Sequence, residues 1–162
     1  MSPLIDSDEY YGIKILKNGA WLYQGSPITR HNLVKLFASV LHKDDKGGYW
    51  LVTPYEKGRI EVEDAPFTAV ELKSSSSGRE QTLLFRTNLD EWVEAGNEHP
   101  LRVEINPETG EPSPYILVRK GLEALIVRSV YYELVKLAVA DETKKGLLGL
   151  WSRNIFFPIG KI

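Results

Sequence analysis

The tetrapeptide LVKL occurs twice in the chain, within HNLVKLFASV (residues 31–40) and within VYYELVKLAV (residues 130–139). A tryptophan follows each copy at the same spacing, Trp50 and Trp151, so both pairs are 101 residues apart (134 − 33 and 151 − 50). In both stretches apolar residues recur every three or four positions, which predicts two amphipathic helices. The repeated order of helix and tryptophan-bearing strand indicates two related halves.

An Ile-x-Arg step precedes each helix, at Ile28–Arg30 and at Ile126–Arg128, although these steps are 98 residues apart (128 − 30) and the alignment needs a three-residue shift. The alternative is two ordinary amphipathic helices made of common residues. We predict an α+β fold of two related antiparallel-sheet-plus-helix halves, residues 1–65 and 66–162, produced by an internal duplication.

The two helices are predicted in more detail from their apolar positions and caps. Thr29 is expected to cap the first helix, and a second helix is expected from Ser129 to about residue 140. The inner face of the first is predicted to hold Leu33, Val34, Leu36, Phe37, Val40 and Leu41. The inner face of the second is predicted to hold Val130, Tyr131, Leu134, Val135 and Ala138.

The remaining segments read mostly as strands. Asn18-Gly19 predicts a first hairpin, because both residues accept positive φ. Residues 49–87 predict an antiparallel meander, and LDEWVEA (residues 89–95) predicts a short helix with a capping box from Asn88 and Glu91. Residues 101–119 predict another hairpin, and residues 146–160 a last strand followed by a packed tail.

Composition excludes several classes of function. The 162 residues contain 20 Lys and Arg against 22 Asp and Glu, a net charge of −2, so we expect no nucleic acid partner. With no cysteine, the chain has no disulfide, thiolate nucleophile or cysteine-bound metal. No export signal or membrane-spanning stretch is visible, so we expect a cytoplasmic protein without a membrane partner.

No catalytic or metal motif is present among the usual signatures, and we expect neither a metal nor a cofactor. The acidic stretch RIEVEDAPF (residues 59–67) is not a catalytic pair by spacing, because Glu61 and Glu63 share one face of a strand and Asp64 points the other way. Asp64 is expected to cap a turn or to meet an arginine.

Arginines mark three element boundaries, Arg30 and Arg128 at helix starts and Arg119 at the end of a strand. A cation at a helix N-terminus opposes the macrodipole, so each of the first two indicates a partner. The partner is either a carboxylate, such as Asp64 or Glu123, or a bound anion.

Four stretches, WLYQGSPITR, YWLVTPYEKGRIEVEDAPF, PYILVRKGLEAL and RSVYYELV, resemble the bacterial domain-of-unknown-function family numbered 1285 over about Gly12 to Gly160. The resemblance implies a duplicated core, a second half like a pleckstrin-homology barrel, and a site between the halves for a nucleotide-like ligand in signalling. It brings no catalytic residue. The motif positions able to meet an anionic ligand are Arg30, Glu56, Asp64, Arg119, Arg128 and Tyr132.

The preferred hypothesis is therefore a cytoplasmic ligand-binding or regulatory module in which Arg30 and Arg128 bind phosphate, Tyr132 packs a base, and Asp64 and Glu56 orient the arginines. One alternative is a hydrolase or transferase using Asp64 or Glu56 as a general base, with a divalent ion. Another is a protein–protein adaptor that uses a strand edge or the NIFFPI tail.

Overall fold

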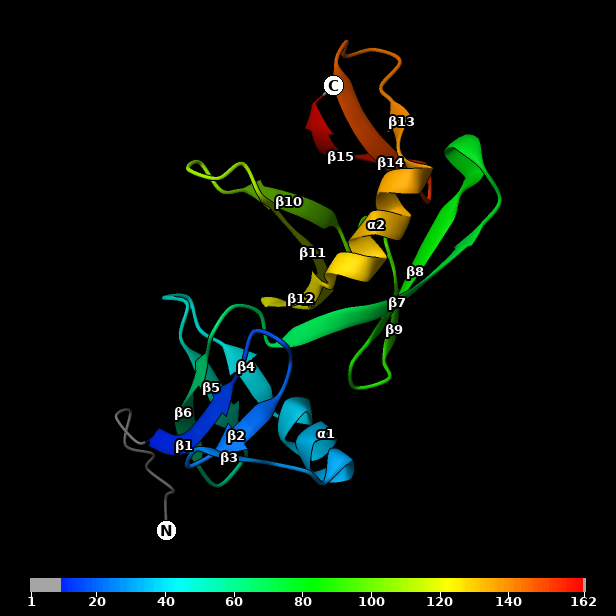
Figure 1. Cartoon of the computed structure of the whole chain (residues 1–162). Helices are drawn as coiled ribbons and strands as arrows, with labels where there is room; N and C mark the ends of the chain where they lie inside the picture. The colour runs from blue at the N-terminus through cyan, green and yellow to red at the C-terminus, as the bar shows by residue number, and fades with distance from the viewer. Residues whose placement is uncertain (1–9, 162) are drawn as a thin grey trace. The chain divides into compact units, whose positions relative to one another are not determined.

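A computed structural model describes residues 10–161 and divides them into two compact units (Figure 1). Of the described residues, the first unit comprises 10–67 together with Lys120–Leu122, and the second comprises Thr68–Arg119 and 123–161. Residues 1–9, on which the expected absence of an export signal depends, lie outside the described residues. Within the described range, neither helix has the length and apolar character needed to cross a bilayer.

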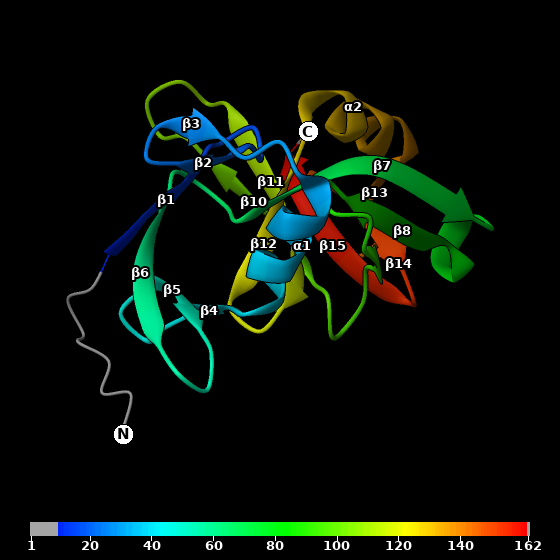
Figure 2. The same cartoon turned by 90° about the horizontal axis from the view of Figure 1, so that it is seen from below.

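The first unit is a six-stranded sheet with one helix, α1. The strands lie in the order β3-β2-β1-β6-β5-β4, and every neighbouring pair is antiparallel except β1 and β6, which are parallel. In both views α1 lies to one side of these strands (Figures 1 and 2). The elements are β1 (Tyr10–Ile15), β2 (Trp21–Tyr23), β3 (Ser26–Pro27), α1 (His31–Ser39), β4 (Leu41–Lys43), β5 (Tyr49–Val52) and β6 (Lys57–Val62).

The predicted first hairpin is confirmed. β1 and β2 pair antiparallel around Asn18-Gly19, where Gly19 has φ 93° and the Asn18 side chain accepts the Ala20 backbone N–H at 3.0 Å. The predicted meander is wrong at its centre, because β6 pairs with β1 and β5, and the next strand joins a different sheet. The parallel β1–β6 pair also corrects the expectation of a purely antiparallel sheet.

The N-cap of α1 lies one residue later than predicted. Arg30 is the N-cap, in extended conformation, and its carbonyl accepts the N–H groups of Leu33 and Val34 at 3.0 and 3.2 Å. Thr29 is therefore not the cap. Leu36, predicted to be inside, is 62% exposed, so the buried stripe of the helix is narrower than the sequence indicated.

An aspartate orders the turn between β4 and β5. Asp44 Oδ1 accepts the backbone N–H groups of Lys46 and Gly48, and Oδ2 accepts the Trp50 indole N–H at 2.7 Å. These hydrogen bonds, the Trp50 bond foremost, hold the pKa of Asp44 below its usual value. Lys57 and Arg59 each place their cation 4.6 Å from the Trp50 ring, which fixes both on that face of the sheet.

The second unit contains two sheets and the helix α2. Its six-stranded sheet has the order β10-β11-β12-β7-β8-β9, and its three-stranded sheet the order β13-β14-β15. β15 lies beside β10, and β14 lies beside β8 (Figure 2). The two sheets are therefore in contact at both of these strand pairs. The elements are β7 (Phe67–Ser75), η1 (Gly78–Glu80), β8 (Thr82–Thr87), β9 (Trp92–Glu94), β10 (Leu101–Ile105), β11 (Pro112–Arg119), β12 (Leu122–Ile126), α2 (Arg128–Leu137), β13 (Val139–Ala140), β14 (Leu147–Ser152) and β15 (Ile155–Lys161).

Three local predictions in this unit are corrected. The segment 89–95 is not a helix: the Thr87 hydroxyl accepts the N–H groups of Leu89 and Glu91, and a tight turn leads into the strand β9. The tail after β14 is itself a strand, β15, in a hairpin. The helix α2 spans Arg128–Leu137, and Val135, predicted to be inside, is 47% exposed.

The two units share an order of elements. In the first, three strands, a helix and three strands are arranged as 3-2-1-6-5-4. In the second, β10 to β12, α2 and β13 to β15 follow the same sequence, and β15 beside β10 gives the corresponding order 12-11-10-15-14-13. Trp50 lies in β5 and Trp151 in the corresponding strand β14. Among the described residues, the strands β7 to β9 have no counterpart in the first unit.

Candidate functional site

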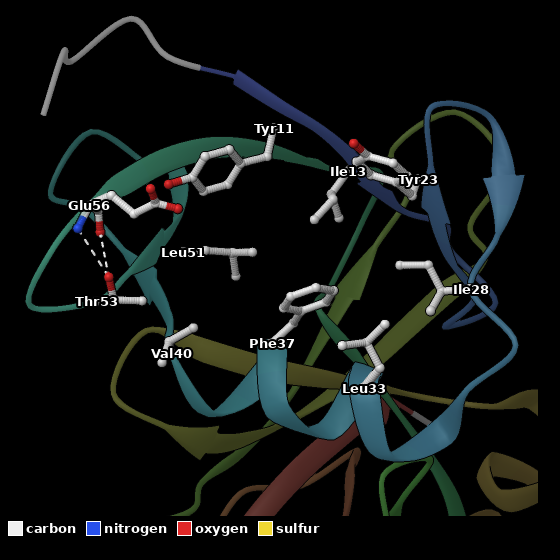
Figure 3. Close-up of a pocket in the computed structure, with 10 residues that line it drawn as sticks. All are labelled: Tyr11, Ile13, Tyr23, Ile28, Leu33, Phe37, Val40, Leu51, Thr53 and Glu56. Atoms are coloured by element: carbon white, nitrogen blue, oxygen red, sulfur yellow. Dashed lines mark hydrogen bonds between the residues drawn. The ribbon is translucent and has the colours of Figure 1, made fainter.

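A pocket of about 480 Å³ opens within the first unit, between α1 and the sheet (Figure 3). Ligand sites in proteins have volumes of about 300–1,000 Å³ and are mostly apolar, with a few placed polar groups. This pocket has both properties. Its lining consists of Tyr11, Ile13, Tyr23, Ile28, Leu33, Phe37, Val40, Leu51, Thr53 and Glu56.

The helix α1 supplies the apolar floor. Leu33, Phe37 and Val40 follow one another at four and three residues, so they lie on one face of the helix and its C-cap. Phe37 is held from behind by the Trp21 ring, which stacks on it at 6.4 Å. The stacking fixes the ring that forms the middle of the floor.

The strands β1, β5 and β6 supply the opposite wall. The Tyr11 ring lies over Gly58, where an added Cβ would collide with it, and Leu51 is the register partner of Gly58 on β5. Gly58 is therefore required for Tyr11 to lie flat on the sheet. Ile13, two residues after Tyr11, completes this wall (Figure 3).

The turn between β5 and β6 makes one end of the pocket polar. The Thr53 hydroxyl accepts the N–H groups of Tyr55 and Glu56 at 3.2 and 3.0 Å and donates to the Glu56 carbonyl at 3.1 Å. The Thr53 N–H donates to the same carbonyl at 2.8 Å. The Glu56 backbone is thereby fixed, and its side chain extends toward the hydroxyl end of Tyr11 (Figure 3).

Of the residues predicted as a ligand site, one lines this pocket, namely Glu56. Arg30 is exposed at the start of α1 and is not part of the lining. In the second unit Arg128 and Tyr132 lie four residues apart on α2, both exposed. Asp64, after β6, and Arg119, the last residue of β11, are half-buried.

The apolar and aromatic members of the lining were not predicted as site residues. Leu33, Phe37 and Val40 were predicted as core residues. A sequence does not distinguish apolar side chains that line a pocket from those that fill a core. Tyr11 and Tyr23 come from strands whose relative position depends on long-range pairing. The Thr53–Glu56 turn carried a local signal, because Thr and Pro before Tyr-Glu favour a turn bonded by the threonine hydroxyl.

A second, polar pocket of about 470 Å³ lies in the second unit, beside β9. Two of its polar side chains are paired: Arg153 Nη1 lies 3.3 Å from Glu94 Oε2, and His99 Nδ1 lies 2.8 Å from the Leu117 carbonyl. This pocket lacks the continuous apolar lining typical of a ligand site, so it is a weaker candidate than the pocket beside α1.

Two family models together match nearly the whole chain. The model described as "Domain of unknown function (DUF1285), N-terminal domain" matches residues 6–65, and "Protein of unknown function (DUF1285), C-terminal domain" matches residues 66–159. The chain belongs to the DUF1285 family. The family resemblance found in the sequence is thereby confirmed.

Two solved structures of DUF1285 family proteins are similar to this chain. The protein from Silicibacter pomeroyi DSS-3 is 42% identical, with a TM-score of 0.88 over 99% of this chain and 85% of its own. The protein from Shewanella baltica OS155 is 29% identical, with a TM-score of 0.59 over 77% of this chain and 91% of its own. The comparison with curated proteins found no match. These DUF1285 relatives support the fold and carry no activity over to this chain.

Proposed function

We propose that the protein is a ligand-binding, regulatory module whose first unit takes a small molecule with an apolar body. The observation that carries this proposal is the pocket of about 480 Å³ between α1 and the sheet, lined by apolar and aromatic side chains and polar at one end. Binding, and not turnover, is the function proposed.

The chemistry of the lining favours a neutral or cationic ligand over an anionic one here. The lining contains one carboxylate, that of Glu56, and no lysine or arginine. A phosphate near Glu56 would meet a like charge without a compensating cation. The nucleotide-like anion expected from the sequence is thus not proposed for this pocket.

Binding of N-phenyl-1-naphthylamine (NPN), a neutral aromatic probe that fluoresces in apolar surroundings, tests the proposal. We expect saturable enhancement of NPN fluorescence with one site per chain, and displacement of NPN by 1-octanol. A titration that rises linearly without saturation, or that octanol does not reverse, would contradict a defined apolar site. Far-UV circular dichroism at each end point controls for unfolding by the alcohol.

A nucleotide-like anion remains the second candidate, supported by α2. Arg128 and Tyr132 lie on one face of that helix, because they are four residues apart, and both are exposed. A guanidinium and a ring so placed can meet a phosphate and a base.

We expect a binding nucleotide to raise the unfolding temperature by several degrees, since a ligand at 100 times its Kd adds about 2.7 kcal/mol. Thermal unfolding with nucleotides and with cyclic and linear dinucleotides measures the effect. The shift should disappear in Arg128→Ala and persist in Lys136→Ala, which removes an exposed cation from the same helix. If none of these compounds changes the unfolding temperature, nucleotide binding at ordinary affinities is contradicted.

A duplication origin and a pleckstrin-homology-like second half are also proposals. The shared order of six strands around one helix supports the duplication. The same duplication predicts that the unit with the added strands β7 to β9 has lost the pocket that its counterpart retains.

A further inference from the structure

We infer that the pocket of the first unit selects a ligand whose head is a protonated amine, with the head at Glu56 and the apolar body along α1. This inference rests on the proposed function, because it assumes that the pocket binds a ligand at all. It assigns the ligand's charge and its direction in the pocket.

The charged group of the lining and most of its polar groups lie at one end, whereas the Tyr23 hydroxyl lies away from that end and accepts the Gln24 side-chain amide at 3.4 Å (Figure 3). Thr53 and Glu56 belong to the β5–β6 turn, while the apolar side chains of Ile28 and Leu33 lie at the other end of the pocket (Figure 3). A ligand with a polar head and an apolar body has one favourable direction in such a site, because burying a polar group among apolar side chains is costly.

Among the polar groups of the lining, the Glu56 carboxylate is the charged acceptor. The Thr53 hydroxyl already donates to the Glu56 carbonyl and accepts two backbone N–H groups. Within residues 10–161 the Glu56 side chain makes no hydrogen bond or ion pair. Both carboxylate oxygens can therefore accept hydrogen bonds from an ammonium head.

The cations of the neighbouring strand lie on the other face of the sheet. Leu51 pairs with Gly58 on the pocket side, whereas Arg59 pairs with Trp50 and so points away from it. Lys57 is on the Arg59 face too, and both cations rest on the Trp50 ring. Neither neutralises Glu56 inside the pocket, so the charge of the site is negative.

Competition among three probes of equal chain length tests the inference: 1-octylamine, 1-octanol and octanoate, each displacing NPN. We expect octylammonium to bind at least about tenfold more tightly than octanol, and octanoate more weakly than octanol, because a charge-assisted hydrogen bond forms only with the amine. In Glu56→Gln, which retains the backbone bonds of the turn, the amine should lose its advantage over octanol. In Glu61→Gln, which removes an exposed carboxylate of β6 outside the lining, the advantage should remain.

The outcomes separate the two proposals. If octanol displaces NPN and octylamine binds no more tightly, the inferred head group is wrong while the apolar site stands. An amine preference that survives in Glu56→Gln, or that Glu61→Gln removes equally, would also overturn the inference. If NPN and all three probes fail to bind, both the proposed function and this inference fail.

Discussion

Leu33→Trp should abolish binding of NPN to the pocket beside α1 while the chain stays folded. Leu33 is a half-buried residue of the lining, so an indole at this position occupies the space that the ligand's apolar body would fill. Apolar surface contributes about 25 cal/mol per Å² when buried, so excluding about 120 Å² of the probe costs about 3 kcal/mol, a loss of roughly 100-fold or more in affinity. Fluorescence titration of NPN measures the loss.

Leu36→Trp is the matched control, three residues further along the same helix. Leu36 is 62% exposed and does not line the pocket, so its replacement should leave NPN affinity within about twofold. Circular dichroism and thermal unfolding should show both variants folded. Wild-type affinity in Leu33→Trp would show that NPN binds elsewhere, and equal loss in both variants would indicate a general effect on the helix.

The contrast between Leu33 and Leu36 shows how much of the burial pattern of α1 helical periodicity can predict. At about 100° per residue, Leu36 lies about 60° beyond Leu33 and away from Val34, at the edge of the apolar stripe. The sequence predicts which face of the helix packs against the sheet, and it predicts most of the residues on that face. It does not predict the width of the contact, because that depends on the strands packed against the helix.

Two other predictions from the sequence are wrong. In one a non-local strand pair, and in the other a competing local hydrogen bond, determines the structure. The β1–β6 pair joins segments about fifty residues apart and leaves no local signal, so the sheet was expected to be antiparallel throughout. The capping-box pattern of Asn88 and Glu91 lost to the Thr87 hydroxyl, which binds two N–H groups of the same segment and closes a turn. Both outcomes follow from contacts that a pattern of residue types does not contain.

The arginines at the element boundaries can be located from the sequence, whereas the pocket cannot. Arg30 and Arg128 do lie at the starts of α1 and α2, as predicted. Both are exposed, and water and salt screen the repulsion from the helix dipole, so the boundary positions need no bound anion. Glu56 was named for its place in a family motif, and only the fold joins it to an apolar pocket.

The residue after the tryptophan differs between the halves in a way that bears on where a ligand can bind. In the first unit Leu51 follows Trp50 and lines the pocket. In the second Ser152 follows Trp151, is 0% exposed, and its hydroxyl donates to the Ala95 carbonyl at 2.7 Å and accepts the Leu83 N–H at 3.0 Å. The hydroxyl thus joins β14 to β8 and to the residue that follows β9.

Ser152→Ala should therefore destabilise the second unit strongly. The substitution leaves a buried N–H and a buried carbonyl without this hydrogen bond, and an unsatisfied buried group costs about 1–3 kcal/mol. We expect a loss of about 2–4 kcal/mol, which in a chain of this size lowers the unfolding temperature by roughly 5–15 °C. Urea and thermal unfolding followed by circular dichroism measure both quantities.

Ser74→Ala, an exposed serine on β7, is the control and should change stability by less than about 0.5 kcal/mol. NPN binding should persist in Ser152→Ala at temperatures where it is folded, because the pocket is built wholly from the first unit. Equal stability of Ser152→Ala and wild type would mean that the other contacts of β14, such as the hydrogen bond from the Gln81 side chain to the Trp151 carbonyl at 3.0 Å, suffice without the Ser152 hydroxyl. A large loss with NPN binding intact would show that the two tryptophan-bearing strands do different things: β5 lines a ligand site, and β14 is bonded to β8 and to the residue after β9.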